Sequence, residues 1–212
     1  MSLAYALKAS RLAWVLFASI IASWALVAFA LDQSVLAVQR SGRLLQFGAI
    51  NGDLLKAGDW WRLLVSQFLH VHAPHMFFNA LATLLIGALV EAGVGRWWLA
   101  FVYFLGGCIG QLASVAYYPS LVSSGASQAL MALCGAVLVM CRTRIAYVIT
   151  ICILAVQLAL DLRVEGTIKA GHGWGFAAGI VLGGVVVLVS RRNVTDRLRH
   201  AAQQLHAASR DT

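Results

Sequence analysis

The stretch SGASQALMALCGAVLVMC, residues 124–141, contains no charged side chain, and its serine and glutamine residues all lie in its first turns. A helix needs about 20 apolar residues to cross a hydrocarbon core roughly 30 Å thick, so this run is close to spanning length. Five more apolar runs of this kind surround it: Leu12–Leu31, His75–Val94, Trp97–Tyr118, Ile145–Leu160 and Ala170–Ser190. The sequence therefore predicts an all-α membrane protein with six transmembrane helices.

The composition agrees with that prediction, because 61% of the residues are hydrophobic and only 11% are charged. Ordinary soluble domains are far more polar. The longest piece between spans, residues 32–74, is too short for a separate soluble domain, so we expect one membrane domain over residues 1–212. The first apolar run follows Lys8 and Arg11 but is longer than the ~7–15 residues of a signal-peptide core, so we expect it to remain as the first span.

Short cytoplasmic loops are enriched in Lys and Arg, and this bias orients the helices. Placing both termini inside puts 10 of the 16 basic residues in the cytoplasm and leaves the outer face nearly neutral. The net charge of +8 then needs no nucleic-acid partner. We expect the basic tail, residues 191–212, to lie in the cytoplasm against anionic lipid head groups.

With this orientation, three spans run from outside to inside and carry their polar residues at their outer ends. Polar groups at bilayer depth are costly, so their gathering on one side indicates a hydrated pocket that opens outward. The residues concerned are His70, His72, His75, Asn79, Ser124, Ser127, Gln128 and His172.

Ser127 and His172 are candidates for a nucleophile and its base. Small residues around Gly125 allow another backbone to approach the fourth span closely, and the sixth span carries a small-residue stripe. Close packing of the two helices would bring the imidazole to the hydroxyl, which is a weak nucleophile until a base accepts its proton. The stripe consists of Gly171, Gly175, Gly179 and Gly183.

An acyl-transfer site also needs hydrogen-bond donors for the developing oxyanion. His75 and Asn79 are four residues apart and so share one helix face, near the first-turn proline Pro74. Taken alone, this pair has ordinary interhelical hydrogen bonding as its alternative explanation.

These residues resemble the motifs of the rhomboid intramembrane serine proteases over nearly the whole chain. The similar pieces are Trp61-Arg62, His70-x4-His75-x3-Asn79, Glu91-x3-Gly95, Gly125-x-Ser127 and His172-x2-Gly175-x3-Gly179. The resemblance implies a catalytic dyad of Ser127 and His172, with His75, Asn79 and the Ser127 amide as the oxyanion hole. His70, Gly125, Gln128, Gly175 and Gly179 would support the site.

The resemblance also implies an interfacial helix in the loop before the second span, which the aromatic pair Trp60-Trp61 favours independently. Two residues depart from the family pattern. Gln128 replaces a glycine beside the serine, and Met131 stands where an aromatic ring often packs on the histidine. Asp161 and Glu165 are expected in an outer loop, with no role as a third catalytic group.

Rival functions have weaker sequence support. No H-E-x-x-H motif or pair of buried aspartates is present. His70, His72 and His75 have no carboxylate or thiolate partner that would complete a metal site, so no metal or other cofactor is expected. The six spans show no inverted repeat of the kind found in transporters. A rhomboid-like protein that binds transmembrane segments without cutting them remains the main alternative, and Gln128 is its best support.

An active enzyme of this kind would act on single-span membrane proteins with helix-breaking residues near their outer boundary. The compact form is typical of bacterial inner-membrane rhomboids, with the rhombosortase type as one candidate subgroup.

Overall fold

The computed structural model describes residues 2–141, 143–165 and 169–208. Side chains are described for the same ranges, except residues 164–165 and 191–208. The predictions for the Glu165 side chain and for the basic side chains of the tail therefore lie outside the described residues, as does Arg142, one of the basic residues placed in the cytoplasm. The helices are α1 Leu3–Ala9, α2 Leu12–Ala30, α3 Ser41–Leu44, η1 Leu45–Phe47, α4 Gly52–Lys56, α5 Arg62–Val65, η2 Ser66–Phe68, α6 Ala73–Val94, α7 Arg96–Tyr117, α8 Ser127–Met140, α9 Arg144–Glu165 and α10 Ala170–Ala208.

Six apolar helices form the bundle, and the all-α polytopic fold predicted from the sequence is confirmed. In the described part of the chain, α2, α6, α7, α9 and the first half of α10 are long and apolar enough to span a membrane. The fourth predicted span is shorter than expected, because α8 has only 14 residues and starts at Ser127. Residues 124–126 precede the helix as a loop. The chain is thus an integral multi-pass membrane protein.

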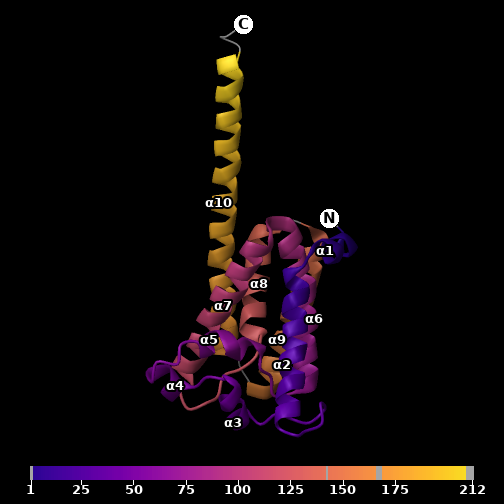
Figure 1. Cartoon of the computed structure of the whole chain (residues 1–212), viewed down its shortest axis with the longest axis vertical. Coiled ribbons are helices and arrows are strands. Elements are labelled where there is room, and N and C mark those ends of the chain that lie inside the picture. Colours follow the sequence, from indigo (N-terminus) through magenta and orange to yellow (C-terminus); the bar gives the residue numbers. More distant parts are fainter. Residues whose placement is uncertain (1, 142, 166–168, 209–212) are drawn as a thin grey trace.

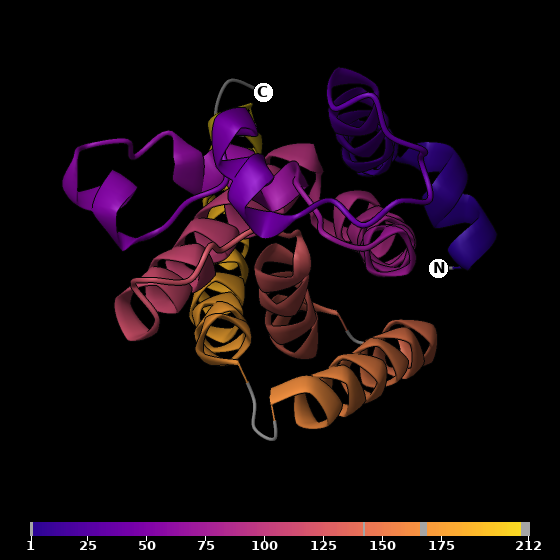
Figure 2. The same ribbon diagram turned by 90° about the horizontal axis from the view of Figure 1, so that it is seen from below.

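Helix α8 lies in the middle of the bundle, with α6, α7, α9 and α10 around it (Figures 1 and 2). Every residue of α8 from Ser127 to Val137 is buried. Its most extensive packing is against α10, and α9 stands at the edge of the bundle (Figure 2). The central helix is therefore held by its neighbours on all sides, which fixes the position of its first residue.

Glycines allow the close approach of α10 to α8. Added Cβ atoms at three successive stripe positions would collide with α8: at Gly175 with the Gln128 carbonyl oxygen, at Gly179 with the Ala132 backbone, and at Gly183 with Ala136. The four-residue spacing matches on both helices, as expected for ridges of one helix lying along the other.

Glu91 near the inner end of α6 joins that helix to the start of α2. Its carboxylate accepts hydrogen bonds from the backbone amides of Arg11, Leu12 and Ala13, at 2.9–3.1 Å. The first amides of a helix have no partner inside it, and a negative charge is favourable there. The family-like Glu91-x3-Gly95 motif thus has a structural explanation.

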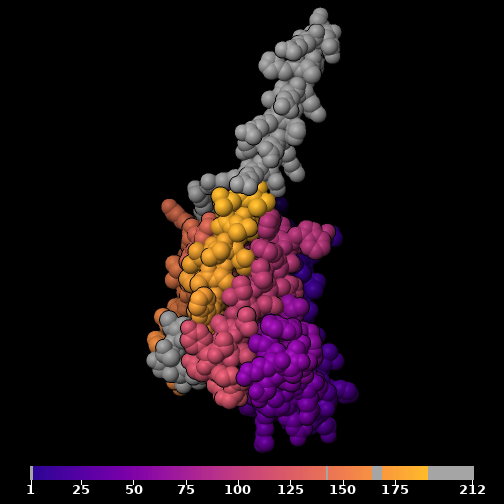
Figure 3. Space-filling view, turned by 90° about the vertical axis from the view of Figure 1, so that its left-hand side faces the viewer, coloured from indigo at the N-terminus to yellow at the C-terminus, as the bar shows by residue number. Residues whose placement is uncertain are grey.

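The predicted interfacial helical loop is present, although it consists of several short helices between α2 and α6 rather than one. Arg62 braces it, because its guanidinium donates to the carbonyl oxygens of Leu45 and Ala49 and pairs with Asp59 at 2.8 Å. Trp61, half exposed, lies 4.6 Å from the Arg62 guanidinium. Figure 3 shows this segment (indigo to purple) gathered at one end of the molecule.

Two end segments complete the chain. The short helix α1 packs against α6 and was not foreseen, since it lies outside the apolar runs. At the other end, α10 continues as a helix to Ala208, well past the last predicted apolar residue, Ser190 (Figure 1).

Candidate active site

Ser127 is the first residue of α8 and is almost fully buried. The loop before it turns at Gly125, whose φ of +124° is accessible at little cost only to glycine. The Gly125 amide donates to the Ser66 carbonyl oxygen at 2.9 Å, and its carbonyl oxygen accepts from Gln111 at 3.2 Å. The nucleophile candidate therefore stands at a helix start that η2 and α7 hold in place.

His70 supports the same loop from the segment before α6. Its Nε2 accepts a hydrogen bond from the Ala126 amide at 3.3 Å, and its Nδ1 lies 3.4 Å from the Phe68 carbonyl oxygen. The ring therefore carries its proton on Nδ1. Burial, and secondarily the nearby His75, lower the pKa of His70 from 6.5 to about 3. A neutral ring is what this arrangement requires.

His172 lies in the first turn of α10, beside the glycine stripe, and is also buried. Its Nε2 lies 2.8 Å from Ser127 Oγ. The close packing at Gly175 and Gly179 explains how two residues 45 positions apart meet at hydrogen-bond distance.

Asp161 contacts the other side of the same ring, and here the sequence expectation was wrong. It lies in helix α9, which extends to Glu165, and not in a loop. Its Oδ2 lies 2.7 Å from His172 Nδ1, and its side chain is buried. The apolar run ends at Leu160, which explains the error. The spacing of Gln157 and Asp161, one helical turn apart, was the signal that could have corrected it.

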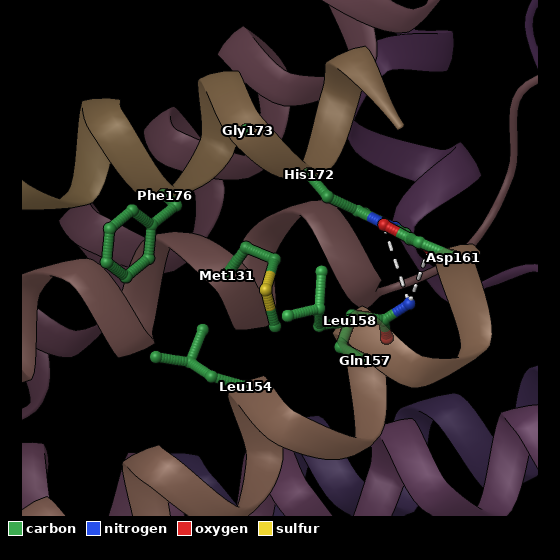
Figure 4. Close-up of a pocket in the computed structure, with 8 residues that line it drawn as sticks. All are labelled: Met131, Leu154, Gln157, Leu158, Asp161, His172, Gly173 and Phe176. Carbon is green, nitrogen blue, oxygen red and sulfur yellow. Dashed lines mark hydrogen bonds and ion pairs between the residues drawn. The ribbon is translucent and has the colours of Figure 1, made fainter. Parts of the chain in front are cut away.

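The contacts around His172 assign its protons. Because the Asp161 carboxylate can only accept, His172 Nδ1 donates to it, and Nε2 is left to accept from the Ser127 hydroxyl. Gln157 Nε2 donates to Asp161 Oδ1 at 3.1 Å and lies 3.5 Å from His172 Nδ1. Figure 4 shows these three side chains converging from α9 and α10. This is the arrangement in which an imidazole can remove a proton from a serine.

His75 and Asn79 are both on α6, as predicted, but only His75 lines the cavity at Ser127. The His75 Nε2 atom is buried without a hydrogen-bond partner. Asn79 is fully buried, and its amide nitrogen donates to the His75 carbonyl oxygen at 3.0 Å. Asn79 has a second N–H besides this one, and His75 Nε2 can also donate when the ring carries its proton there.

Gln128 lies within the site, and its side chain is buried. Its Oε1 lies 3.2 Å from Ser127 Oγ, a second acceptor for the one hydroxyl proton, but farther away than His172. Glycines make room for the side chain, because a Cβ at Gly110 or Gly171 would press on it. Gln128 is therefore accommodated beside the serine without displacing His172.

Two hollows flank the paired residues. One, about 170 Å³, is lined by Ser127, His172, His75 and Gln128 together with residues of the loop between α7 and α8. The other cavity, about 190 Å³ and mostly apolar, lies beside His172 between α8, α9 and α10 (Figure 4). Met131 lines the second, so the position where an aromatic ring was considered is occupied by a smaller, flexible side chain.

Comparison with known proteins gives a consistent result. Residues 57–189 match the family model described as Rhomboid domain. Rhomboid protease GluP of Bacillus subtilis (strain 168) is 33% identical over 142 residues, which is 64% of this chain and 28% of that protein. Rhomboid protease AarA of Providencia stuartii is 38% identical over 79 residues, 37% of this chain and 28% of that protein.

Not all relatives are named as proteases. Inactive RHOMBOID-like protein 8 of Arabidopsis thaliana is 33% identical over 78 residues, 37% of this chain and 22% of that protein. The matched part spans less than a third of the length of each of these three relatives. The match of the family model nevertheless covers more than half of this chain, including Ser127 and His172. The chain belongs to the rhomboid family.

Proposed function

We propose that the protein is an intramembrane serine endopeptidase that cleaves single-span membrane proteins, with Ser127 as nucleophile and His172 as base. The observation that carries this proposal is the 2.8 Å contact between Ser127 Oγ and His172 Nε2 in a buried site. Neutral imidazole is suited to accept the hydroxyl proton near neutral pH.

The reaction follows the general course of serine acyl transfer. Ser127 Oγ attacks the carbonyl carbon of the scissile bond while its proton moves to His172 Nε2. The carbonyl π electrons move to oxygen, and as the tetrahedral intermediate collapses, the C–N bond breaks and His172 protonates the leaving amine. Water, deprotonated by the same imidazole, then hydrolyses the acyl-enzyme and restores Ser127.

The oxyanion is assigned to His75, Asn79 and the Ser127 amide. The unpartnered, buried Nε2 of His75 on the wall of the Ser127 cavity supports this assignment. The Ser127 amide is at the start of α8, where amides lack helical partners and the helix dipole favours negative charge. Asn79 has a second N–H besides the one bound to the His75 carbonyl oxygen, although its side chain does not line the Ser127 cavity.

The membrane setting follows from the charge distribution. We infer that both termini are cytoplasmic and that the Ser127 cavity opens to the outer face of a bacterial inner membrane, since most Lys and Arg residues then lie inside. Anionic lipids would contact the basic tail, residues 191–212. No nucleic-acid partner or cofactor is part of the proposal.

Cleavage of a reporter transmembrane substrate in liposomes tests the proposal. The wild type should cut, and Ser127→Ala and His172→Ala should each lose at least about 10³-fold in kcat/KM. Ser23→Ala, a serine of α2 outside the site, is the matched control and should cut normally. Thermal unfolding must show that all variants are folded. A wild type that cuts no substrate, or a Ser127→Ala variant that still cuts, would overturn the proposal.

The second candidate is an inactive member that binds transmembrane segments, and the contact of Gln128 Oε1 with Ser127 Oγ favours it. If Gln128 held the hydroxyl permanently, Ser127 would not react. A fluorophosphonate probe decides between the two functions, because it labels an activated serine whatever the substrate. Labelling of wild type but not of Ser127→Ala supports the protease, and absence of labelling supports the binding protein.

A further inference from the structure

Asp161 is the carboxylate that the proposed dyad does not use. It belongs to the spanning part of α9, yet only 2% of its surface is exposed. A carboxylate at bilayer depth is expensive, and such residues face the bundle interior and carry function more often than not. Its place beside His172 therefore calls for a physical explanation.

Three donors from two segments fix this carboxylate. His172 Nδ1 donates to Oδ2 at 2.7 Å, and the Lys169 backbone amide donates to the same oxygen at 3.2 Å. Gln157 Nε2 donates to Oδ1 at 3.1 Å. A carboxylate held on both oxygens can neither rotate nor exchange partners freely, so it presents a fixed acceptor to the imidazole.

We propose that Asp161 is a positioning residue that holds the His172 imidazole with its proton on Nδ1, so that the site works as a Ser127–His172–Asp161 triad. The inference rests on the proposed protease function and extends the dyad by one group. Asp161 does not touch the substrate; it acts through His172. Gln157, one turn earlier on α9, in turn orients Asp161 through its hydrogen bond to Oδ1.

The geometry favours this role over a simple connection between α9 and α10. The bond from the Lys169 amide would suffice for a connection, because Gln157 lies on α9 itself. The shortest contact, however, is with His172 Nδ1, and a proton held on Nδ1 leaves Nε2 free to accept from Ser127. A carboxylate there also stabilises the imidazolium that forms as Ser127 attacks. The other groups near His172 are Ser127 on α8, His75 on α6 and Lys169 before α10.

The isosteric change Asp161→Asn tests the role. We expect kcat to fall by about 10²–10⁴-fold with little change in KM, as when the aspartate of a soluble triad is replaced. The acidic limb of the pH profile should move to lower pH, because the imidazolium loses its counter-charge. Asp161→Glu should recover part of the activity. Asp53→Asn, an exposed acid of α4, is the matched charge control and should behave as wild type.

Nitrogen-15 NMR of labelled histidine gives a readout that does not depend on proteolysis. The His172 signals are identified by their loss in His172→Gln. Wild type should show neutral His172 protonated on Nδ1, and Asp161→Asn should shift that population toward Nε2.

The outcomes separate the two proposals. An unchanged tautomer and an unchanged acidic limb in Asp161→Asn would overturn the role of Asp161, even if the protease is active. A wild type that cuts nothing would overturn the protease function, while the NMR comparison would still decide whether Asp161 positions His172. Activity lost only in proportion to thermal stability would show a structural connection and also contradict the proposal.

Discussion

At the scale of single residues, His70 shows how one buried ring organises the loop that carries the nucleophile. The ring accepts from the Ala126 amide, one residue before Ser127, and must be neutral to do so. The pKa of His70 is held at about 3, mainly by burial, against 6.5 for an unperturbed histidine. Between these values the unfolded chain binds a proton that the folded chain does not.

This difference predicts a loss of stability in acid. The contribution of neutral His70 is fully present above pH 6.5 and is lost as the pH falls toward 3. At pH 5 the loss is about 2 kcal/mol in the free energy of unfolding. Thermal unfolding in detergent from pH 7.5 to 5 should therefore show a smaller decline for His70→Gln, which cannot titrate, than for wild type. The control is His72→Gln, which changes an exposed histidine and should decline as much as wild type. If wild type declines as little as His70→Gln, the explanation is contradicted.

At the scale of helices, the site depends on the distance between α8 and α10. Gly179 and Gly184 lie on the same helix, but only Gly179 contacts α8; a Cβ on Gly184 would meet nothing within 4 Å. Replacing glycine by alanine favours the helical conformation by roughly 1 kcal/mol, and this gain is the same at both positions. Gly184→Ala should thus be neutral or slightly stabilising, while Gly179→Ala should destabilise by about 1–3 kcal/mol through overpacking.

Activity should follow the same contrast. Displacing α10 moves His172 away from Ser127, and a misplacement of about 1 Å can cost roughly 10²-fold in rate. Gly179→Ala is therefore expected to cut slowly even below its unfolding temperature, with Gly184→Ala as active as wild type. Equal melting temperatures and rates for the two variants would show that the stripe does not set this distance. Thermal unfolding and reporter cleavage measure both effects.

Helices were predictable here because apolar runs are long and their ends carry charges. Observed helix starts and ends for α2, α6 and α7 lie within two residues of the predicted ones. The error at Asp161 has the opposite cause: hydropathy ends a span at the first charged residue, whereas the backbone continues as helix when a carboxylate finds buried partners. The small residues of the two helices predicted that Ser127 and His172 would meet. They could not predict the distance between Ser127 Oγ and His172 Nε2.

The fourth span was predicted, but its start was placed three residues too early, at Ser124 instead of Ser127. Residues 124–126 are as apolar and small as those of a helix, so pattern alone extends the fourth span through them. The positive φ of Gly125 and the bonds of its backbone to Ser66 and Gln111 keep these residues out of the helix, and those bonds are contacts between distant segments. Such tertiary contacts are invisible in local periodicity.

At the scale of the whole molecule, the shortness of α8 determines the depth at which the proposed protease would cut. Its 14 residues span about 21 Å, whereas the 22 residues of α6 or α7 span about 33 Å. Its other end, Met140, lies four residues before the basic residue Arg144, which the proposed orientation places at the cytoplasmic surface. In the proposed orientation, Ser127 would therefore lie about 10 Å below the outer ends of its neighbours, inside the bilayer but on its outer side.

A substrate must bring an extended backbone to that depth, because a helical peptide bond is shielded by its own hydrogen bonds and side chains. We expect cleavage of single-span proteins whose small or helix-breaking residues lie in the outer third of the span. Replacing those residues by leucine should reduce cleavage at least about tenfold, since leucine stabilises the helix and makes unwinding costlier. Leucines placed in the inner third are the matched control and should leave the rate unchanged. Mass spectrometry of the products in liposomes locates the cut, and efficient cutting of a uniform leucine helix would refute the depth argument.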